Sequence, residues 1–184
     1  YRYLDTAYRL FARLTGGIPD TTTVAIETGE RAVTLPATTL KIARASRASD
    51  GAKVDVINHT DLDRLHLRDD QKGPVRYLLV GVQMHKGTLY DIPVADDTLN
   101  LVIQRLPLTH ITQAGQDLSE IDEDHHLALL DWMKSLAYKR PGADFFNPTL
   151  AAAFATSFTA YCQQAKSEIA TMRHRIRSTT YGGC

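Results

Sequence analysis

The stretch RYLLVGVQMHKGTLYDI, residues 76–92, carries a strong indication of a β-sheet. Its first seven residues are rich in tyrosine, leucine and valine, which is typical of a strand. His85-Lys86-Gly87 predicts a hairpin turn, and Thr88–Ile92 predicts the returning strand, which Pro93 closes. Similar short apolar runs, cut by turn residues, occur at Arg31–Leu35, Leu40–Ala45, Lys53–Asn58 and Leu99–Leu106. We therefore expect a small antiparallel sheet or sandwich over residues 21–108, with a helical turn or two at Thr60–Leu65.

Helical periodicity flanks this β-rich region on both sides. Apolar residues recur at steps of three and four from Leu4 to Leu14, and Gly16-Gly17 ends that helix. Ser119 can cap a second helix with an acidic first turn. Its expected buried face consists of Leu127, Leu130, Met133, Leu136 and Ala137. Asn147-Pro148 begins a third helix. Its apolar stripe consists of Leu150, Phe154, Phe158, Tyr161, Cys162, Ala165, Ile169 and Met172.

These patterns together predict an α+β fold. We expect a helical bundle, made of the N-terminal helix and two C-terminal helices, with an inserted antiparallel β-sheet or sandwich and an extended C-terminal tail. The corresponding segments are residues 1–20 for the N-terminal helix, 21–108 for the β-rich insertion, 109–172 for the C-terminal helix pair and 173–184 for the extended basic tail.

The composition is that of an ordinary folded protein of 184 residues, large enough for a real core. Lysine and arginine total 21, and so do aspartate and glutamate, so bulk charge favours neither nucleic acid nor a membrane as partner. The sequence contains no run of about 18 apolar residues, so it predicts no membrane span. The two cysteines, Cys162 and Cys184, do not suggest a disulfide framework or a zinc site.

Candidate catalytic and metal-binding residues are few. Asp122, His125 and His126 have a helical spacing that suits metal ligands, but no second cluster would complete the site, so we interpret them as a charged helix start. Cys162 lies on an apolar stripe and is interpreted as a core residue. The sequence contains neither a Gly-x-Ser-x-Gly turn nor a phosphate-binding loop. We therefore predict no catalytic residues, no bound metal and no cofactor.

The C-terminal segment carries the best candidates for binding a partner. Arg173, Arg175, Arg177 and Tyr181 combine positive charge with an aromatic ring, and no acidic residue accompanies them. Such a tail can dock on an acidic protein surface through bidentate arginine contacts, or it can contact nucleic acid. A solvated tail is the third interpretation.

The order of these features resembles that of phage head-to-tail adaptor (connector) proteins of the podovirus tail-tubular type. Such proteins open with a helix, here Leu4–Leu14, and pass through a β-rich stretch to a long C-terminal helix with alternating Ala, Phe and Tyr. The elements that carry the resemblance are, in chain order, Leu35-Pro36, Gly73-Pro74-Val75-Arg76-Tyr77, Leu89-Tyr90-Asp91-Ile92-Pro93, Asp96-Asp97, Arg105-Leu106-Pro107 and His126-Leu127-Ala128-Leu129. The resemblance covers nearly the whole chain.

The resemblance implies a structural subunit of the phage neck and not an enzyme. Such a subunit forms an adaptor ring, of about twelve copies, that docks on the portal and connects head to tail. The implied partners are the portal protein, a tail or nozzle protein, copies of the chain itself and the double-stranded DNA that passes through the lumen, contacted non-specifically. No membrane is implied, and the protein would be found in the virion after assembly in the host cytoplasm.

Three alternatives remain open from the sequence. A tail-completion or terminator ring would bind the tail tube instead of the portal. A nucleic-acid-binding module would use the tail from Arg173, and its affinity would fall steeply with salt. A metal-dependent enzyme would use Asp122, His125 and His126, and bound zinc or manganese would reveal it.

Overall fold

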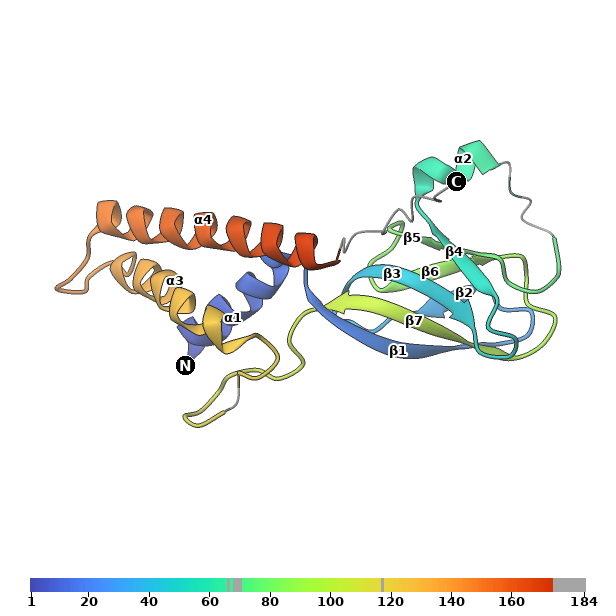
Figure 1. Ribbon diagram of the computed structural model, residues 1–184, viewed down its shortest axis with the longest axis horizontal. Coiled ribbons are helices and arrows are strands. Elements are labelled where there is room, and N and C mark those ends of the chain that lie inside the picture. The colour runs from blue at the N-terminus through green and yellow to red at the C-terminus, as the bar shows by residue number, and fades with distance from the viewer. Residues whose placement is uncertain (66, 68–70, 117, 174–184) are drawn as a thin grey trace, which may run out of the picture. The chain divides into compact units, whose positions relative to one another are not determined.

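The computed structural model describes residues 1–65, 67, 71–116 and 118–173 (Figure 1). The chain divides into two compact units. The sheet unit is Gly17–Leu108, and the helical unit combines Tyr1–Gly16 with Thr109–Cys184. Figure 1 shows the strands gathered in the first unit, and α1, α3 and α4 in the second.

The sheet unit contains seven strands and one short helix in its described part. They are β1 (Ile18–Ile26), β2 (Ala32–Thr34), β3 (Thr39–Arg47), β4 (Lys53–Ile57), α2 (His59–Leu65), β5 (Tyr77–Val80), β6 (Lys86–Tyr90) and β7 (Asp97–Arg105). The strands form one curved half-barrel in the order β1-β7-β3-β4-β5-β6-β2. Neighbouring strands run antiparallel except β4 and β5, which are parallel.

Alternating side chains build the core of this unit. Leu99, Leu101 and Ile103 of β7 are buried, and the residues between them face outward, because successive side chains of a strand point to opposite faces. Leu78 and Leu89 sit opposite one another on β5 and β6 and are fully buried. The main apolar cluster of the sheet therefore draws on every strand, and a smaller cluster is formed by Ile57, Leu79 and Tyr90.

The helical unit contains α1 (Arg2–Thr15), the 3-10 helix η1 (Glu123–His125), α3 (His126–Tyr138) and α4 (Pro148–Arg173). The three α-helices contact one another pairwise. α1 ends at Gly16, whose positive φ of 99° suits a residue without a Cβ. The Oδ1 of Asn147 accepts a hydrogen bond from the Leu150 amide at 3.0 Å, as expected of a residue that caps α4.

The fold class predicted from the sequence was wrong. The described helices form no clear bundle, and the sheet, with seven strands in one half-barrel, is more than an insertion between helices. The sheet is also mixed instead of antiparallel, because the connection through α2 is long enough to bring β5 alongside β4 in the same direction. The predicted tail, residues 173–184, lies outside the described residues apart from Arg173, which ends α4.

Two local predictions were also corrected. The turn expected at His85-Lys86-Gly87 lies earlier in the chain, because Lys86 and Gly87 already pair with β2 and so belong to β6. The second helix begins at His126 instead of Ser119, and Asp122 caps the 3-10 turn that precedes it. The buried residues of α3 are Leu129 and Ser135, whereas the predicted face residues Leu127 and Leu130 are exposed.

Candidate interaction surfaces

The predicted docking residues lie at and beyond the end of α4. Arg173 is the last residue of that helix, and Arg175, Arg177 and Tyr181 lie outside the described residues. Their role in binding a partner therefore stays a prediction.

The candidate metal cluster is used for packing and capping. The Nδ1 of His125 lies 2.9 Å from the hydroxyl of Tyr161, and the same hydroxyl lies 3.3 Å from the Asp124 carbonyl. The Nε2 of His126 lies 3.0 Å from the Ile121 carbonyl and donates to it, because a carbonyl oxygen can only accept. The described residues include no group of three His, Cys, Asp or Glu side chains that could hold a metal ion.

The His125–Tyr161 contact joins three segments of the helical unit. The ring of Phe11 on α1 lies 5.0 Å from the His125 ring and 6.4 Å from the Tyr161 ring, measured between centroids. Burial, together with the charges of Glu168 and Asp124, raises the pKa of the Tyr161 phenol, so the hydroxyl stays protonated as a donor. The cluster fixes the start of α3 against α1 and α4.

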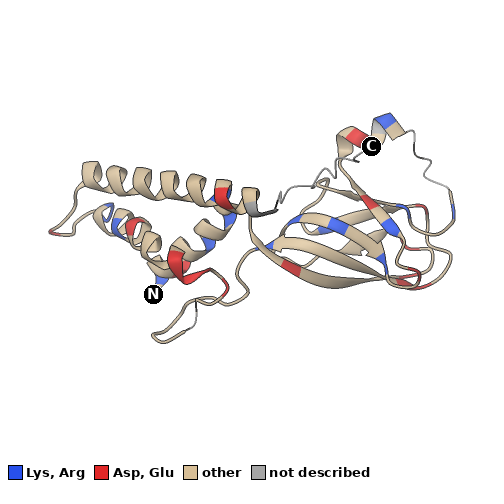
Figure 2. Ribbon diagram, viewed as in Figure 1, with Lys and Arg blue, Asp and Glu red and all other residues tan. Residues whose placement is uncertain are grey.

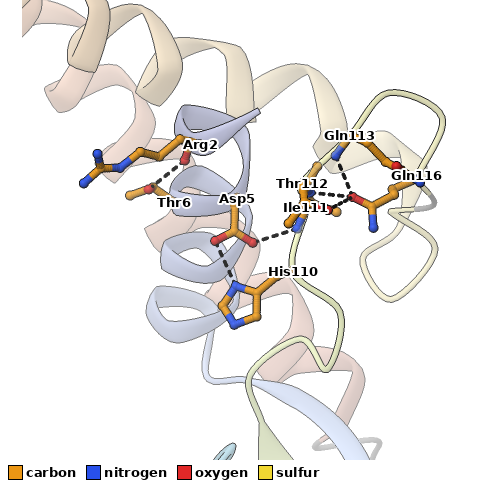
Figure 3. A network of polar contacts seen from close by, with 8 residues as sticks. All are labelled: Arg2, Asp5, Thr6, His110, Ile111, Thr112, Gln113 and Gln116. Atoms are coloured by element: carbon orange, nitrogen blue, oxygen red, sulfur yellow. Dashed lines mark hydrogen bonds and ion pairs between the residues drawn. The ribbon is translucent and has the colours of Figure 1, made fainter.

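A second polar network holds the segment after residue 109 on α1 (Figure 3). The Oδ1 of Asp5 accepts a hydrogen bond from the Ile111 amide at 2.9 Å, and its Oδ2 lies 3.2 Å from the Nδ1 of His110. The Oε1 of Gln116 accepts from the backbone amides of Thr112 and Gln113, which shapes the following turn. The Asp5 carboxylate and the Gln116 carbonyl oxygen are thus bound by the chain itself, so we assign this network a structural role.

Large apolar side chains are exposed at two places on the helical unit. Leu127 and Leu130, 78% and 44% exposed, lie three residues apart on α3 and therefore share a face of that helix. Phe145 and Phe146 lie in the connection between α3 and α4, and Leu150 follows in the first turn of α4. Exposed apolar groups of this size mark protein–protein contact surfaces when they gather on one element.

The connection that carries Phe145 is well supported. Its ring packs edge-on against Tyr138, with centroids 6.2 Å apart, and Tyr138 stacks on Phe154 at 5.8 Å. The Asn147 amide donates to the Tyr138 carbonyl at 3.0 Å. Phe145 is thus held outward by contacts behind it, which lowers the entropy lost when a partner covers it.

The outer face of α4 is uncharged over most of its length. The helix contains no Asp, Glu, Lys or Arg between Pro148 and Ala165, and Figure 2 shows its charged residues only near its C-terminal end. Beyond Leu150 in the first turn, the exposed side chains of this stretch are small or polar, among them Ala152, Ala153, Thr156, Thr159, Ala160 and Gln163. Thr156 and Thr159 donate their hydroxyls to carbonyls one turn back, at 3.0 and 2.8 Å, so another helix can approach without leaving these hydroxyls unpaired.

A family model described as the SU10 adaptor protein matches residues 1–181 of this chain. The chain belongs to the SU10 adaptor protein family. The match confirms the resemblance to phage head-to-tail adaptors, and it makes this SU10 adaptor a structural protein of the phage particle. None of the curated proteins compared with the chain matches it. Among its described helices, no helix of this adaptor is long and apolar enough to cross a membrane.

Some of this adaptor's surface features escaped the sequence analysis. The spacing of Leu127 and Leu130 predicts core positions, because apolar residues at a helical spacing usually face inward, and both are exposed. Phe145 and Phe146 stand in a loop without periodicity, so only their unusual position outside a helix could have drawn attention to them. The lack of charge from Pro148 to Ala165 is a signal that can be read directly from the sequence.

Proposed function

We propose that this SU10 adaptor assembles into a ring between the portal and the tail, and that DNA passes through the ring. The uncharged outer face of α4, together with the exposed apolar residues of α3 and the α3–α4 connection, is the observation that supports assembly. The adaptor acts in this proposal as a structural subunit and performs no catalysis.

A closed ring needs two different surfaces on each subunit, one for each neighbour. The helical unit offers two such surfaces, the outer face of α4 and the exposed pair Leu127 and Leu130 on α3. We propose that the first surface of one copy packs on the second surface of the next. We propose about twelve copies, the number that the resemblance to phage adaptors implies for a ring that matches the portal.

Docking on the portal is assigned to the tail that begins at Arg173. Bidentate contacts with carboxylates on the portal can be formed by Arg173, Arg175 and Arg177. The ring of Tyr181 can fill a groove on the portal surface. A tail or nozzle protein would bind the opposite side of the ring. The equal numbers of basic and acidic residues give the adaptor no bulk attraction to DNA. Contact with the passing DNA would therefore be local, non-specific and salt-sensitive.

Co-sedimentation with purified portal rings tests the docking. We expect the full-length chain to sediment with the portal and a version truncated after Met172 to stay in solution. A variant with Arg173, Arg175 and Arg177 changed to lysine is the matched control, because it keeps the charge and loses the bidentate contacts. Binding of the full-length chain to tail tubes and not to portal would select a terminator ring instead.

Ring formation is tested separately, by native mass spectrometry of the complex with the portal. Ala153→Glu places a charge on the outer face of α4 and should prevent assembly of the ring, while circular dichroism stays unchanged because Ala153 is exposed. Thr171→Glu, near the charged end of the same helix, is the control and should assemble. Equal assembly by both variants would argue against the α4 face as the subunit contact.

A further inference from the structure

The half-barrel is split between two of its central strands. β3 and β4 pair only at Ala45 with Val54 and Ser46 with Lys53. Residues 39–44 continue alongside β7, and residues 55–57 continue alongside β5. Within the described part of the chain, residues 39–44 pair with no strand on the side facing β4, and residues 55–57 pair with none on the side facing β3. Each stretch therefore presents as an open edge only the backbone groups that do not bond to its neighbouring strand. In β4 this is Val56, because the Asp55 amide already donates to the Arg76 carbonyl at 2.8 Å and Ile57 bonds to β5 in the same way.

Two irregularities of β3 account for the split. Its register with β7 shifts between Thr39 and Lys41 and again between Ile42 and Arg44, so Leu40 and Ala43 have no partner residue on β7. Such bulges bend a strand and increase its local twist. β4 meanwhile runs parallel to β5. β3 and β4 therefore separate on the N-terminal side of Ala45, toward Thr39.

A groove of about 600 Å³ lies at this split. Both diverging strands line it, and so does the turn between β5 and β6. Its apolar lining includes Leu35, Ile42 and Ile57, which are buried, together with the exposed Leu40 and Met84. The amide of Leu35 donates to the carbonyl of His85 at 2.9 Å and so holds that turn at the rim. The volume is within the range of preformed binding sites.

The charged residues of the groove are mainly basic. Lys41, Lys53 and Lys86 line it, and Asp55 is the only carboxylate among the lining residues described. Asp55 is engaged by Lys53, with Nζ and Oδ1 2.5 Å apart. Lys41 and Lys86 form no ion pair with any described residue. The groove thus favours an occupant with negative charge.

We propose that this groove binds an extended, acidic segment of a partner protein, which enters the split as an added β-strand. Main-chain hydrogen bonds to the free edge of residues 39–44 and to Val56 hold the segment in place. Its apolar side chains contact Ile42 and Ile57, and its carboxylates meet Lys41 and Lys86. The six residues of the β3 edge offer a contact about 20 Å long. The arginine-rich tail of the adaptor itself does not fit this charge pattern. The inference goes beyond the proposed function and does not depend on ring formation.

Synthetic peptides test the chemistry of the occupant. The probes are a blocked octapeptide of alternating valine and glutamate and its valine–lysine counterpart, each titrated against the full chain by fluorescence anisotropy. We expect the acidic peptide to bind at least about tenfold more tightly, because its carboxylates meet Lys41 and Lys86, which form no ion pair within the described part of the chain. No binding by the acidic peptide overturns the proposal. Tighter binding by the basic peptide, by a peptide of residues 174–184 or by a single-stranded oligonucleotide also overturns it.

Protein variants place the site. Lys41→Glu combined with Lys86→Glu should abolish the preference for the acidic peptide, and the valine–lysine peptide should now bind better. Lys72→Glu combined with Lys166→Glu changes the net charge equally at exposed positions outside the groove lining and should keep the preference. If the two double variants behave alike, the groove is not the site.

Hydrogen exchange separates strand addition from simple charge attraction. The bound acidic peptide should slow amide exchange within residues 39–44 and at Val56 of the adaptor. The same peptide with alternate amides N-methylated along one edge cannot donate to the groove and should bind at least about tenfold more weakly. Equal binding by the methylated peptide, or unchanged exchange in both strands, would overturn the added strand.

Discussion

Gly87 stands in β6 at a point where no side chain fits. A Cβ built there would lie 2.7 Å from the Cδ1 of Leu78 and 3.0 Å from a Cγ of Val33. Both neighbours belong to the core of the sheet unit, so they cannot move aside freely. The glycine therefore allows β5 and β2 to approach β6 closely on that face.

Gly87→Ala should lower the free energy of unfolding of the adaptor by about 1–3 kcal/mol, because the added methyl group overpacks the core. Gly73→Ala is the matched control, since its Cβ would meet nothing closer than the Cβ of Asp91 at 3.9 Å. Chemical denaturation followed by circular dichroism measures both variants. Equal stability of the two variants would show that the sheet relaxes around the extra carbon.

Cys162 is buried in α4, and burial raises the pKa of its thiol to about 11. The thiolate that reacts with disulfide reagents is therefore scarce at neutral pH, and the reagent also lacks access. In a Cys184→Ser variant, we expect labelling by Ellman's reagent only as fast as the helical unit opens, and complete labelling in denaturant. Rapid labelling in native buffer would mean that the packing of α4 opens easily.

The connection between β6 and β7 ties three elements of the sheet unit together. The Oδ1 of Asp96 accepts hydrogen bonds from the backbone amide and the hydroxyl of Thr28, both at 2.7 Å, just after β1 ends. Asp97 accepts from the hydroxyl of Ser49 at 2.7 Å, in the turn between β3 and β4. The hydrogen bonds from Thr28 and Ser49 lower the pKa of the two carboxyl groups below their ordinary value.

These lowered pKa values predict a loss of stability in acid. A carboxyl group with a lower pKa in the folded chain than in the unfolded one stabilises the fold above the unfolded pKa of about 3.9. That contribution is lost as pH falls through the folded pKa, so the free energy of unfolding should decrease below about pH 4. Asp97→Asn should flatten this pH dependence, whereas Asp144→Asn in the helical unit should not. Denaturant titrations between pH 2 and pH 7 measure it, and parallel curves for both variants would contradict it.

The sheet unit begins and ends on paired strands. Ile18 of β1 lies opposite Arg105 of β7, and Arg105 also forms an ion pair with Asp20. The chain therefore enters and leaves this unit at neighbouring points. The pairing joins residues far apart in the sequence, which is typical of a domain that closes on itself before the rest of the chain continues.

Residues 17–108 expressed alone should therefore fold. We expect a strand-rich circular dichroism spectrum, dispersed amide resonances and a cooperative thermal transition, because the apolar cluster of the sheet lies wholly within this segment. A segment from 32 to 108, which lacks β1, is the control and should not fold, since the buried residues of β7 lose a neighbour. A disordered spectrum for residues 17–108 would show that the sheet needs the helical unit.

Much of the secondary structure could be predicted from local patterns. In α1 and α4 the apolar residues recur at steps of three and four, which predicts the buried face of each helix. Phe11, Phe158 and Cys162 are indeed buried. The helix α2 and most strands also lie near their expected positions, because turn residues mark their ends. The resemblance to the adaptor family rests on the order of these elements along the chain. That order can be read from the sequence alone, because it does not depend on which elements contact one another.

Strand pairing and exposure were decided only by the tertiary structure. A strand pairs through backbone groups that every residue has, so apolar alternation cannot show that β4 runs parallel to β5 or that β3 leaves β4 beyond Ala45. Gly87 looks locally like a turn residue and is instead a point of close packing. Leu127 is apolar at a helical spacing, and yet it is 78% exposed, because the side of α3 that contacts the other helices is set by the geometry of their packing.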